Sequence, residues 1–346
     1  GASSALVWYL LQRKGNILSI KGQMKEEPSR PRLHFWEQML HSTWQIIAVG
    51  AGAPVGKEGA PREIGSLLAP PLGRVLDLSF QDRIFLIACG AGAGLAAVYQ
   101  VPLTSVFFIF ETFGLAFSMK RFVLAGITTY VAAYTAGWVI SDRALYQVSE
   151  ITWSPTVLWQ MVIFIAFLTP VAWHFARFTK KASIYRIKDK RILITLPLAF
   201  VFLAGLASFQ PHLLGNGRMM AQEILNGGTW QTIFLLLTLK ALVVLLTFWA
   251  GAYGGTLTPS FALGMAGAAL ISLVLGIGNT PAFFLLGSVC FLTVTLKAPL
   301  SATGLVLGFT GQGLTALPYL LLTAFLTVGF SKGLDHLMGK KSRSLQ

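Results

Sequence analysis

An acidic residue, Glu58, lies in a Gly/Pro-rich interruption of otherwise apolar sequence. The stretch Ala51–Gly65 reads AGAPVGKEGAPREIG, and almost two hundred residues later Ala250–Gly264 reads AGAYGGTLTPSFALG. Both stretches have the same length and begin with A-G-A, and Gly56 of the first matches Gly255 of the second. Two interrupted helices in corresponding halves of a membrane protein indicate a binding site near the bilayer midplane.

These interruptions suit the binding of a bare anion. Helix N-termini carry about half a positive charge and several unpaired N–H groups, so N-termini aimed at one point form an anion site without a cationic side chain. Gly59 and Gly254 allow close approach of the backbone, and Pro61 and Pro259 fit a first helical turn. We therefore predict anion binding by N–H groups, with the Glu58 carboxylate as a competing anion.

The composition is that of a polytopic membrane protein. The 346 residues are 54% hydrophobic and 12% charged, whereas a soluble domain is about 25% charged. Apolar runs recur along the whole length, so we predict a single integral-membrane domain over 1–346. The net charge is +14, but the basic clusters lie between apolar runs, which indicates cytoplasmic loops and contact with the lipid bilayer rather than binding of nucleic acid. This pattern places both chain ends, the loop near 120 and the loop near 185 inside the cell.

Apolar runs bounded by Gly, Pro and charged residues predict an all-α fold. Several runs are shorter than the roughly 20 residues that cross the hydrocarbon, and half-length helices are tolerated only where protein or a water-filled cavity covers their ends. We therefore expect many tilted, half-length and re-entrant helices. The expected helices are Phe35–Ala53, Glu63–Leu78, Arg83–Gln100, Pro102–Phe113, Phe122–Ile140, Thr156–Phe178, Ile192–Ser208, Thr229–Trp249, Phe261–Leu275, Pro281–Leu296, Pro299–Phe309 and Leu314–Phe330.

Four segments resemble the CLC family of chloride channels and anion/proton exchangers. Gly56–Gly65 resembles its G-[RK]-E-G-x motif, and Gly255–Pro259 resembles its G-x-F-x-P motif with leucine in place of phenylalanine. Ala91–Thr112 resembles the family segment that runs to an inner proton-transfer glutamate, and Lys297–Leu307 resembles the matching segment of the second half. The similarity extends from about residue 5 to about residue 335, with the motifs in the family's order.

The resemblance implies a CLC-type pair of inverted repeats, here 1–142 (incomplete at its N-terminus) and 150–338, and a homodimer with one pore in each subunit. It implies that Glu58 is the gating and proton-accepting residue, which blocks the pore when ionised and swings aside when protonated. It also implies that the transported anion is bound largely by backbone N–H groups. The anion-binding residues implied in this way are Lys57, Gly59, Ala60, Gly255, Thr256, Leu257 and Thr258.

The sequence departs from the family pattern in four places. The G-S-G-I-P segment aligns with KGNIL, so Gly15 stands at the serine position and Asn16 is the nearest polar candidate for the anion site. Thr112 aligns with the inner proton-transfer glutamate, and Glu111 precedes it, so these two residues are the candidates for an internal proton path. The stretch Leu334–Lys341 has no tyrosine where the family places one in the pore, and the first one to two helices are absent. The lost hydroxyls predict a weaker central anion site.

We therefore predict a transporter of small monovalent anions, chloride first, that exchanges anions for protons in a bacterial plasma membrane. The alternatives are a passive chloride channel, a fluoride/proton antiporter and a non-conducting membrane scaffold. The sequence contains no cofactor motif, metal-ligand spacing or nucleophile motif, so we expect neither an enzyme nor a metal site. The chain begins with Gly1 inside an apolar segment, which suggests that N-terminal sequence is missing.

Overall fold

The computed structural model describes residues 1–346 except 14–16, 26–33, 141–143, 152, 279 and 344–346, and it describes side chains as far as residue 338. Within these ranges the chain folds into α-helices without a β-strand, as the sequence predicts. The helices of the first half are α1 (Ala2–Gln12), α2 (Ile20–Met24), α3 (Phe35–Gly50), α4 (Gly59–Val75), α5 (Phe80–Tyr99), α6 (Pro102–Phe113) and α7 (Met119–Gly137).

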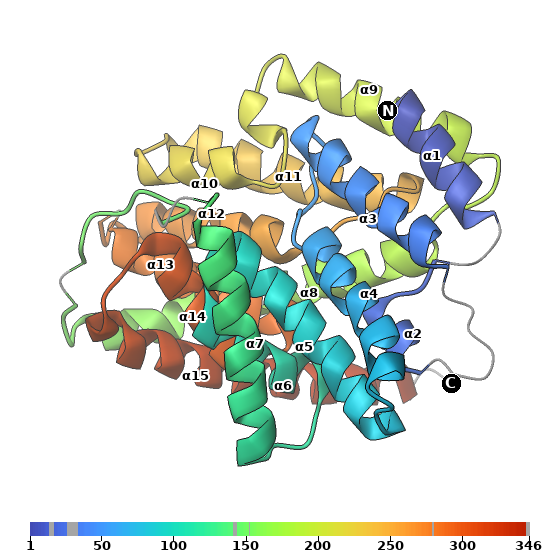
Figure 1. Ribbon diagram of the computed structural model, residues 1–346. Helices are drawn as coiled ribbons and strands as arrows, with labels where there is room; N and C mark the ends of the chain where they lie inside the picture. Colours follow the sequence, from blue (N-terminus) through green and yellow to red (C-terminus); the bar gives the residue numbers. More distant parts are fainter. Residues whose placement is uncertain (14–16, 26–33, 141–143, 152, 279, 344–346) are drawn as a thin grey trace.

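The second half begins with the longest helix described, α8, and ends with α15, which runs almost to the C-terminus (Figure 1). Two short 3₁₀ turns, Pro211–Leu213 and Leu314–Ala316, precede α10 and α15 respectively. The helices of this half are α8 (Val157–Ile184), α9 (Ile192–Ala207), α10 (Arg218–Leu225), α11 (Trp230–Ala250), α12 (Leu257–Leu275), α13 (Pro281–Leu296), α14 (Pro299–Thr310) and α15 (Leu317–Arg343).

The helical surface is that of an integral-membrane protein. Five of the described helical segments are long and apolar enough to cross a membrane: α5, α8, α11, α12 and the stretch 314–338. The outer helices expose large apolar side chains, for example Ile127 and Val131 of α7 and Phe325 of α15. Such contiguous exposed apolar surface suits lipid chains rather than water.

Two helices begin one turn earlier than the sequence analysis predicted. The expected starts were Glu63 and Phe261, whereas α4 begins at Gly59 and α12 begins at Leu257. In both helices a proline, Pro61 or Pro259, occupies the third helical position, where its missing N–H removes no intrahelical hydrogen bond. The prolines therefore belong to the first turn, and each helix begins inside its Gly-rich interruption.

The half-length helices α6 and α14 are a matched pair. Each has 12 residues and a proline at its start, and each ends at a glycine in the left-handed region. The two helices pack against each other, so closely that a Cβ atom at Gly304 or Gly308 of α14 would overlap Thr104 or Val101. The start of α6 thus lies against the middle and end of α14.

The packing partners of the two interrupted helices also correspond. Helix α4 packs on α5 and α12 packs on α13, and both contacts bring glycine backbones together, Gly65 to Gly90 and Gly264 to Gly287. The two halves are further joined where α1 lies beside α9 (Figure 1). These parallels support the proposed division into repeats 1–142 and 150–338.

Candidate functional site

The two Gly-rich interruptions meet. Gly56 and Gly255 form an isolated antiparallel bridge in which each N–H donates to the other's carbonyl oxygen, with N···O distances of 2.7 and 2.8 Å. A Cβ atom at either glycine would overlap the Glu58 carboxylate. The bridge therefore brings the starts of α4 and α12 together, and glycine is needed on both sides because the acidic side chain fills the space beside them.

The Glu58 carboxylate lies at the N-terminus of α12. Glu58 is the N-cap residue of α4, and its side chain is 1% exposed. The Leu257 N–H donates to Oε1 at 2.6 Å, and the Thr258 hydroxyl donates to Oε2 at 3.0 Å. A helix N-terminus is a ready anion site, so the carboxylate occupies a position that suits a free anion.

The charged neighbours of Glu58 do not form an ion pair with its carboxylate. Arg62 Nε donates to the Glu58 backbone carbonyl at 2.9 Å, and its guanidinium lies over the Phe108 ring at 5.3 Å. The Lys57 ammonium lies 5.7 Å from the centroid of the Tyr99 ring. The carboxylate is therefore held by neutral donors and the helix dipole, which an incoming anion can use in the same way.

Comparison with known proteins agrees with this geometry. The profile of the family described as "Voltage gated chloride channel" matches residues 1–332. The chain belongs to this CLC family. Among curated relatives, the "H(+)/Cl(-) exchange transporter ClcA" of Vibrio cholerae is 27% identical over 307 residues, which cover 82% of this chain and 64% of that protein. The "Voltage-gated ClC-type chloride channel ClcB" of Shigella flexneri is 26% identical, with coverage of 86% and 73%.

Solved structures show the same fold. A slow cyanobacterial Cl⁻/H⁺ antiporter superposes with a TM-score of 0.84 at 20% identity, covering 96% of this chain and 81% of that one. A CLC-type fluoride/proton antiporter superposes with a TM-score of 0.74 at 19% identity, covering 95% and 84%. The expectation of an all-α CLC fold with re-entrant helices is thus confirmed.

The remaining residues predicted for the CLC site lie at the starts of α4 and α12 or outside the described residues. Gly59 and Ala60 form the first turn of α4 beside Glu58, and Thr256 is the N-cap residue of α12. Gly15 and Asn16 fall outside the described residues, so their predicted contact with the anion stays a prediction. Within the described part of the chain, no group of three His, Cys, Asp or Glu side chains suits a metal ion.

Glu111 and Thr112 occupy different environments at the end of α6. The Glu111 carboxylate accepts the N–H groups of Leu300 and Ser301 at 2.9 and 2.8 Å and the Ser301 hydroxyl at 2.6 Å. It therefore caps the N-terminus of α14. The Thr112 hydroxyl is buried without a hydrogen-bond partner, and a threonine cannot carry a proton by titration.

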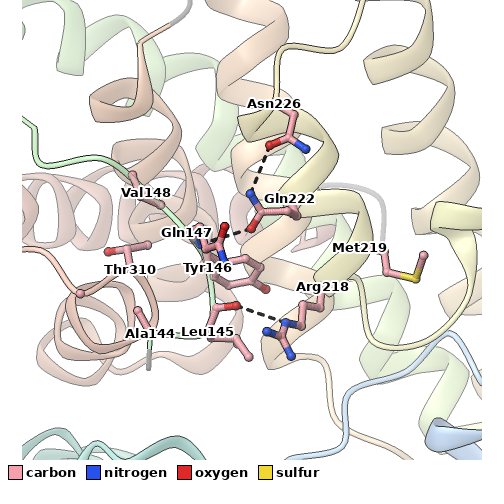
Figure 2. A pocket seen from close by; sticks show the side chains of 11 residues that line it. Ala144, Leu145, Tyr146, Gln147, Val148, Arg218, Met219, Gln222, Asn226 and Thr310 are labelled. Carbon is pink, nitrogen blue, oxygen red and sulfur yellow. Dashed lines mark hydrogen bonds between the residues drawn. The ribbon is translucent and has the colours of Figure 1, made fainter. Parts of the chain in front are cut away.

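A cavity of about 930 Å³ is lined by the segment 144–148 and by residues of α10 (Figure 2). Its wall includes Tyr146, whose ring stacks on the Phe261 ring of α12 with 4.6 Å between the ring centroids. The wall also includes the exposed Arg218, whose Nε donates to the Leu145 carbonyl at 3.2 Å (Figure 2). The Tyr146 hydroxyl is buried without a hydrogen-bond partner. Tyr146 and Arg218 were missed by the sequence analysis because neither belongs to a recognisable motif.

The segment before Arg218 is fixed by a buried lysine. Lys240, fully buried in α11, donates to the carbonyl oxygens of Leu213 and Gly215 at 2.8 and 2.6 Å. The Gly215 N–H in turn donates to the Gly52 carbonyl at 3.0 Å. The segment before α10 is therefore tied to the interruption that carries Glu58.

Proposed function

We propose that this CLC protein moves small monovalent anions, chloride first, across a membrane in exchange for protons, with Glu58 as gate and proton acceptor. The observation that carries this proposal is the buried Glu58 carboxylate on the N-terminus of α12. The names of the relatives, which include H⁺/Cl⁻ exchange transporters and chloride channels, support it. Because the chain spans 64% of the length of the Vibrio relative, activity and substrate are proposed for this chain rather than transferred.

The gate works through competition for the same donors. In the ionised state the Glu58 carboxylate holds the Leu257 N–H and the Thr258 hydroxyl, so an anion cannot use them. Protonation removes the negative charge that the helix dipole and the donors stabilise, and the neutral carboxyl group leaves the site. An anion then takes the freed donors, and its departure allows the deprotonated carboxylate to return.

The proposed anion-binding groups are of two kinds. The first kind is at the start of α12, where the Leu257 N–H and the Thr258 hydroxyl now hold the carboxylate oxygens and the N–H groups of Thr256 and Thr258 complete the proposed set. The N–H groups at the start of α4, from Gly59 and Ala60, form a second N-terminus next to the first. Lys57 acts on the anion through the electrostatic field of its charge, because its ammonium lies over the Tyr99 ring and not next to the Glu58 carboxylate.

Flux measurements in proteoliposomes test the proposal. Chloride efflux should depend on pH in the wild-type protein, and a chloride gradient should drive proton uptake. In Glu58→Gln, proton uptake should be abolished and chloride flux should no longer depend on pH. The exposed loop residue Glu150 provides the control: Glu150→Gln should behave as wild type. Unchanged pH dependence in Glu58→Gln would refute Glu58 as the gate.

The same preparation separates the alternatives. Chloride flux without proton uptake would indicate a passive channel, and absence of any anion flux would indicate a scaffold. Competition between chloride and fluoride identifies the preferred anion. The resemblance further implies a homodimer in a bacterial plasma membrane, and we include both in the proposal; the mass of the purified protein in detergent tests the oligomeric state.

A further inference from the structure

The buried face of α3 is polar where it meets α4. Gln38, His41, Ser42 and Gln45 follow the helical spacing i, i+3, i+4 and i+7, and each is at most 2% exposed. Burying polar groups away from water is costly unless they are paired, and polar side chains inside membrane proteins usually have a function. We call these four side chains, together with Glu63 of α4, the α3–α4 seam.

Glu63 is the centre of the seam. Its Oε2 accepts the Ser42 hydroxyl at 2.9 Å and the Gln38 amide at 3.3 Å, and His41 Nε2 lies 3.8 Å from the same oxygen. The Glu63 side chain is 17% exposed, whereas His41 is fully buried. Glu63 is therefore the member of the seam that carries a carboxyl group and is not fully buried.

The seam continues toward Glu58. Glu63 follows Glu58 by five residues on α4, a rise of about 7.5 Å along the axis. The gap is bridged on the α3 side, because Gln45 Oε1 lies so close to Gly59 that a Cβ atom there would overlap it. Gln45 Oε1 and both ring nitrogens of His41 are buried without a hydrogen-bond partner. Such buried polar atoms are the groups to which ordered water binds.

Two cationic side chains lie close enough to act on the Glu63 carboxylate. Arg62 of α4 and Arg186 of the loop before α9 both act on its carboxylate. The Arg186 guanidinium lies 3.7 Å from the centroid of the Tyr253 ring, and that ring meets the His41 ring edge-on at 4.4 Å. Burial lowers the pKa of the Arg186 guanidinium, while Tyr253 and the Glu63 carboxylate act in the opposite direction.

Helices α1 and α2 each place a neutral side chain around the seam. The ring of Trp8 in α1 lies beside the Tyr253 ring, with 6.0 Å between the ring centroids. From α2, Gln23 Oε1 accepts the hydroxyl of Ser66, one turn beyond Glu63, at 3.1 Å. Arg186 belongs to the basic segment 177–191, which the charge pattern predicts to be cytoplasmic. The seam thus runs from the gate toward the predicted inner face.

The residues at the end of α6 are poorly suited to carry protons from that face. Removing the Glu111 carboxylate from its three donors would leave the N-terminus of α14 uncapped. Thr112 has no titratable group. A proton path to Glu58 therefore needs another carboxyl group, and the structure presents Glu63 on the same helix as the gate.

We propose that Glu63 is the inner proton-accepting residue of this CLC chain, with His41 and Gln45 as the polar link to Glu58. This inference rests on the proposed exchange function. A proton from water on the inner side binds the Glu63 carboxylate, is passed along the seam to the Glu58 carboxylate, and leaves Glu63 ionised again beside Arg62 and Arg186. The neutral Glu58 side chain then releases the donors of α12.

Parallel measurement of proton uptake and chloride efflux in proteoliposomes tests this role. For Glu63→Gln we expect proton uptake to fall by about 100-fold, the scale of a lost acid–base group, while chloride efflux stays within about twofold of wild type. Glu63→Asp should restore part of the proton flux, because it restores the carboxyl group. His41→Gln should reduce the ratio of protons to chloride ions without abolishing chloride efflux. Glu150→Gln is the matched control.

The outcomes separate this inference from the proposed function. If the wild type takes up no protons, the exchange function itself fails. If the wild type takes up protons and Glu63→Gln does so with the same ratio to chloride, Glu63 is not the inner acceptor. Equal loss of both fluxes in a monodisperse Glu63→Gln protein would also overturn the inference. If that variant does not fold, the flux ratio of Glu63→Asp and His41→Gln decides, and a wild-type ratio in both refutes the relay.

Discussion

The hydroxyl of Thr258 gives a quantitative test of the gate. It donates to Oε2 of Glu58 at 3.0 Å and is one of two donors to this carboxylate that the structure describes, the other being the Leu257 N–H at 2.6 Å. A hydrogen bond to a charged group contributes about 1.5–3 kcal/mol. Thr258→Val keeps the β-branched shape in a fully buried position but removes the donor, so the closed state should lose about this much stability.

The sign of the effect on transport follows from the gate. The hydroxyl stabilises the ionised, closed state, so its loss means that less acid is needed to open the pore. Since about 1.4 kcal/mol corresponds to one pH unit, the midpoint of the pH profile of chloride efflux should move up by about 1 to 2 pH units.

A chloride electrode and proteoliposomes over a pH series measure this midpoint, and Thr258→Ser, which keeps the hydroxyl, should stay close to wild type. An unchanged midpoint in Thr258→Val, or a shift to lower pH, would refute the competition mechanism.

Two further substitutions test the surroundings of the gate and the role of Glu111. Gly255→Ala places a Cβ atom where the Glu58 carboxylate lies, so chloride efflux should lose its pH dependence. Gly126→Ala, at an open position, should leave the pH dependence unchanged. Equal pH profiles of chloride efflux in both variants would contradict the position of the Glu58 carboxylate beside Gly255. Glu111→Gln should lower the stability of the protein in detergent by about 1 kcal/mol through loss of the α14 cap, seen as a lower Tm, with an unchanged proton-to-chloride ratio. A changed ratio with an unchanged Tm would instead place Glu111 on the proton path.

The sequence was sufficient to predict the interruption that carries Glu58, because its signals are local. Glycines and prolines that interrupt an apolar run are visible without any knowledge of distant contacts, and the two interruptions matched each other in length. The interruptions are expected to aim helix N-termini at one point, and the structure joins Gly56 to Gly255 by a hydrogen-bonded bridge. The expected helix starts are one turn too late, because the two residues before each proline are helical as well.

The polar seam and the Glu111 cap could not be predicted with the same ease. The sequence analysis includes Phe35–Ala53 only among the apolar runs, although the spacing of Gln38, His41 and Gln45 indicates a polar face. The function of Glu111 depends on Ser301, which lies 190 residues away in sequence. No pattern near α6 carries that information, so only the packing of α6 on α14 shows it.

The paired backbone bonds between Gly56 and Gly255 restrict how the pore opens. Many secondary transporters expose their sites by rocking one half of the molecule against the other, but here such a motion would have to break the bridge that joins the halves beside the ion. Rotation of the Glu58 side chain requires no such break. Opening of the pore should therefore leave the two halves of the scaffold joined at Gly56 and Gly255.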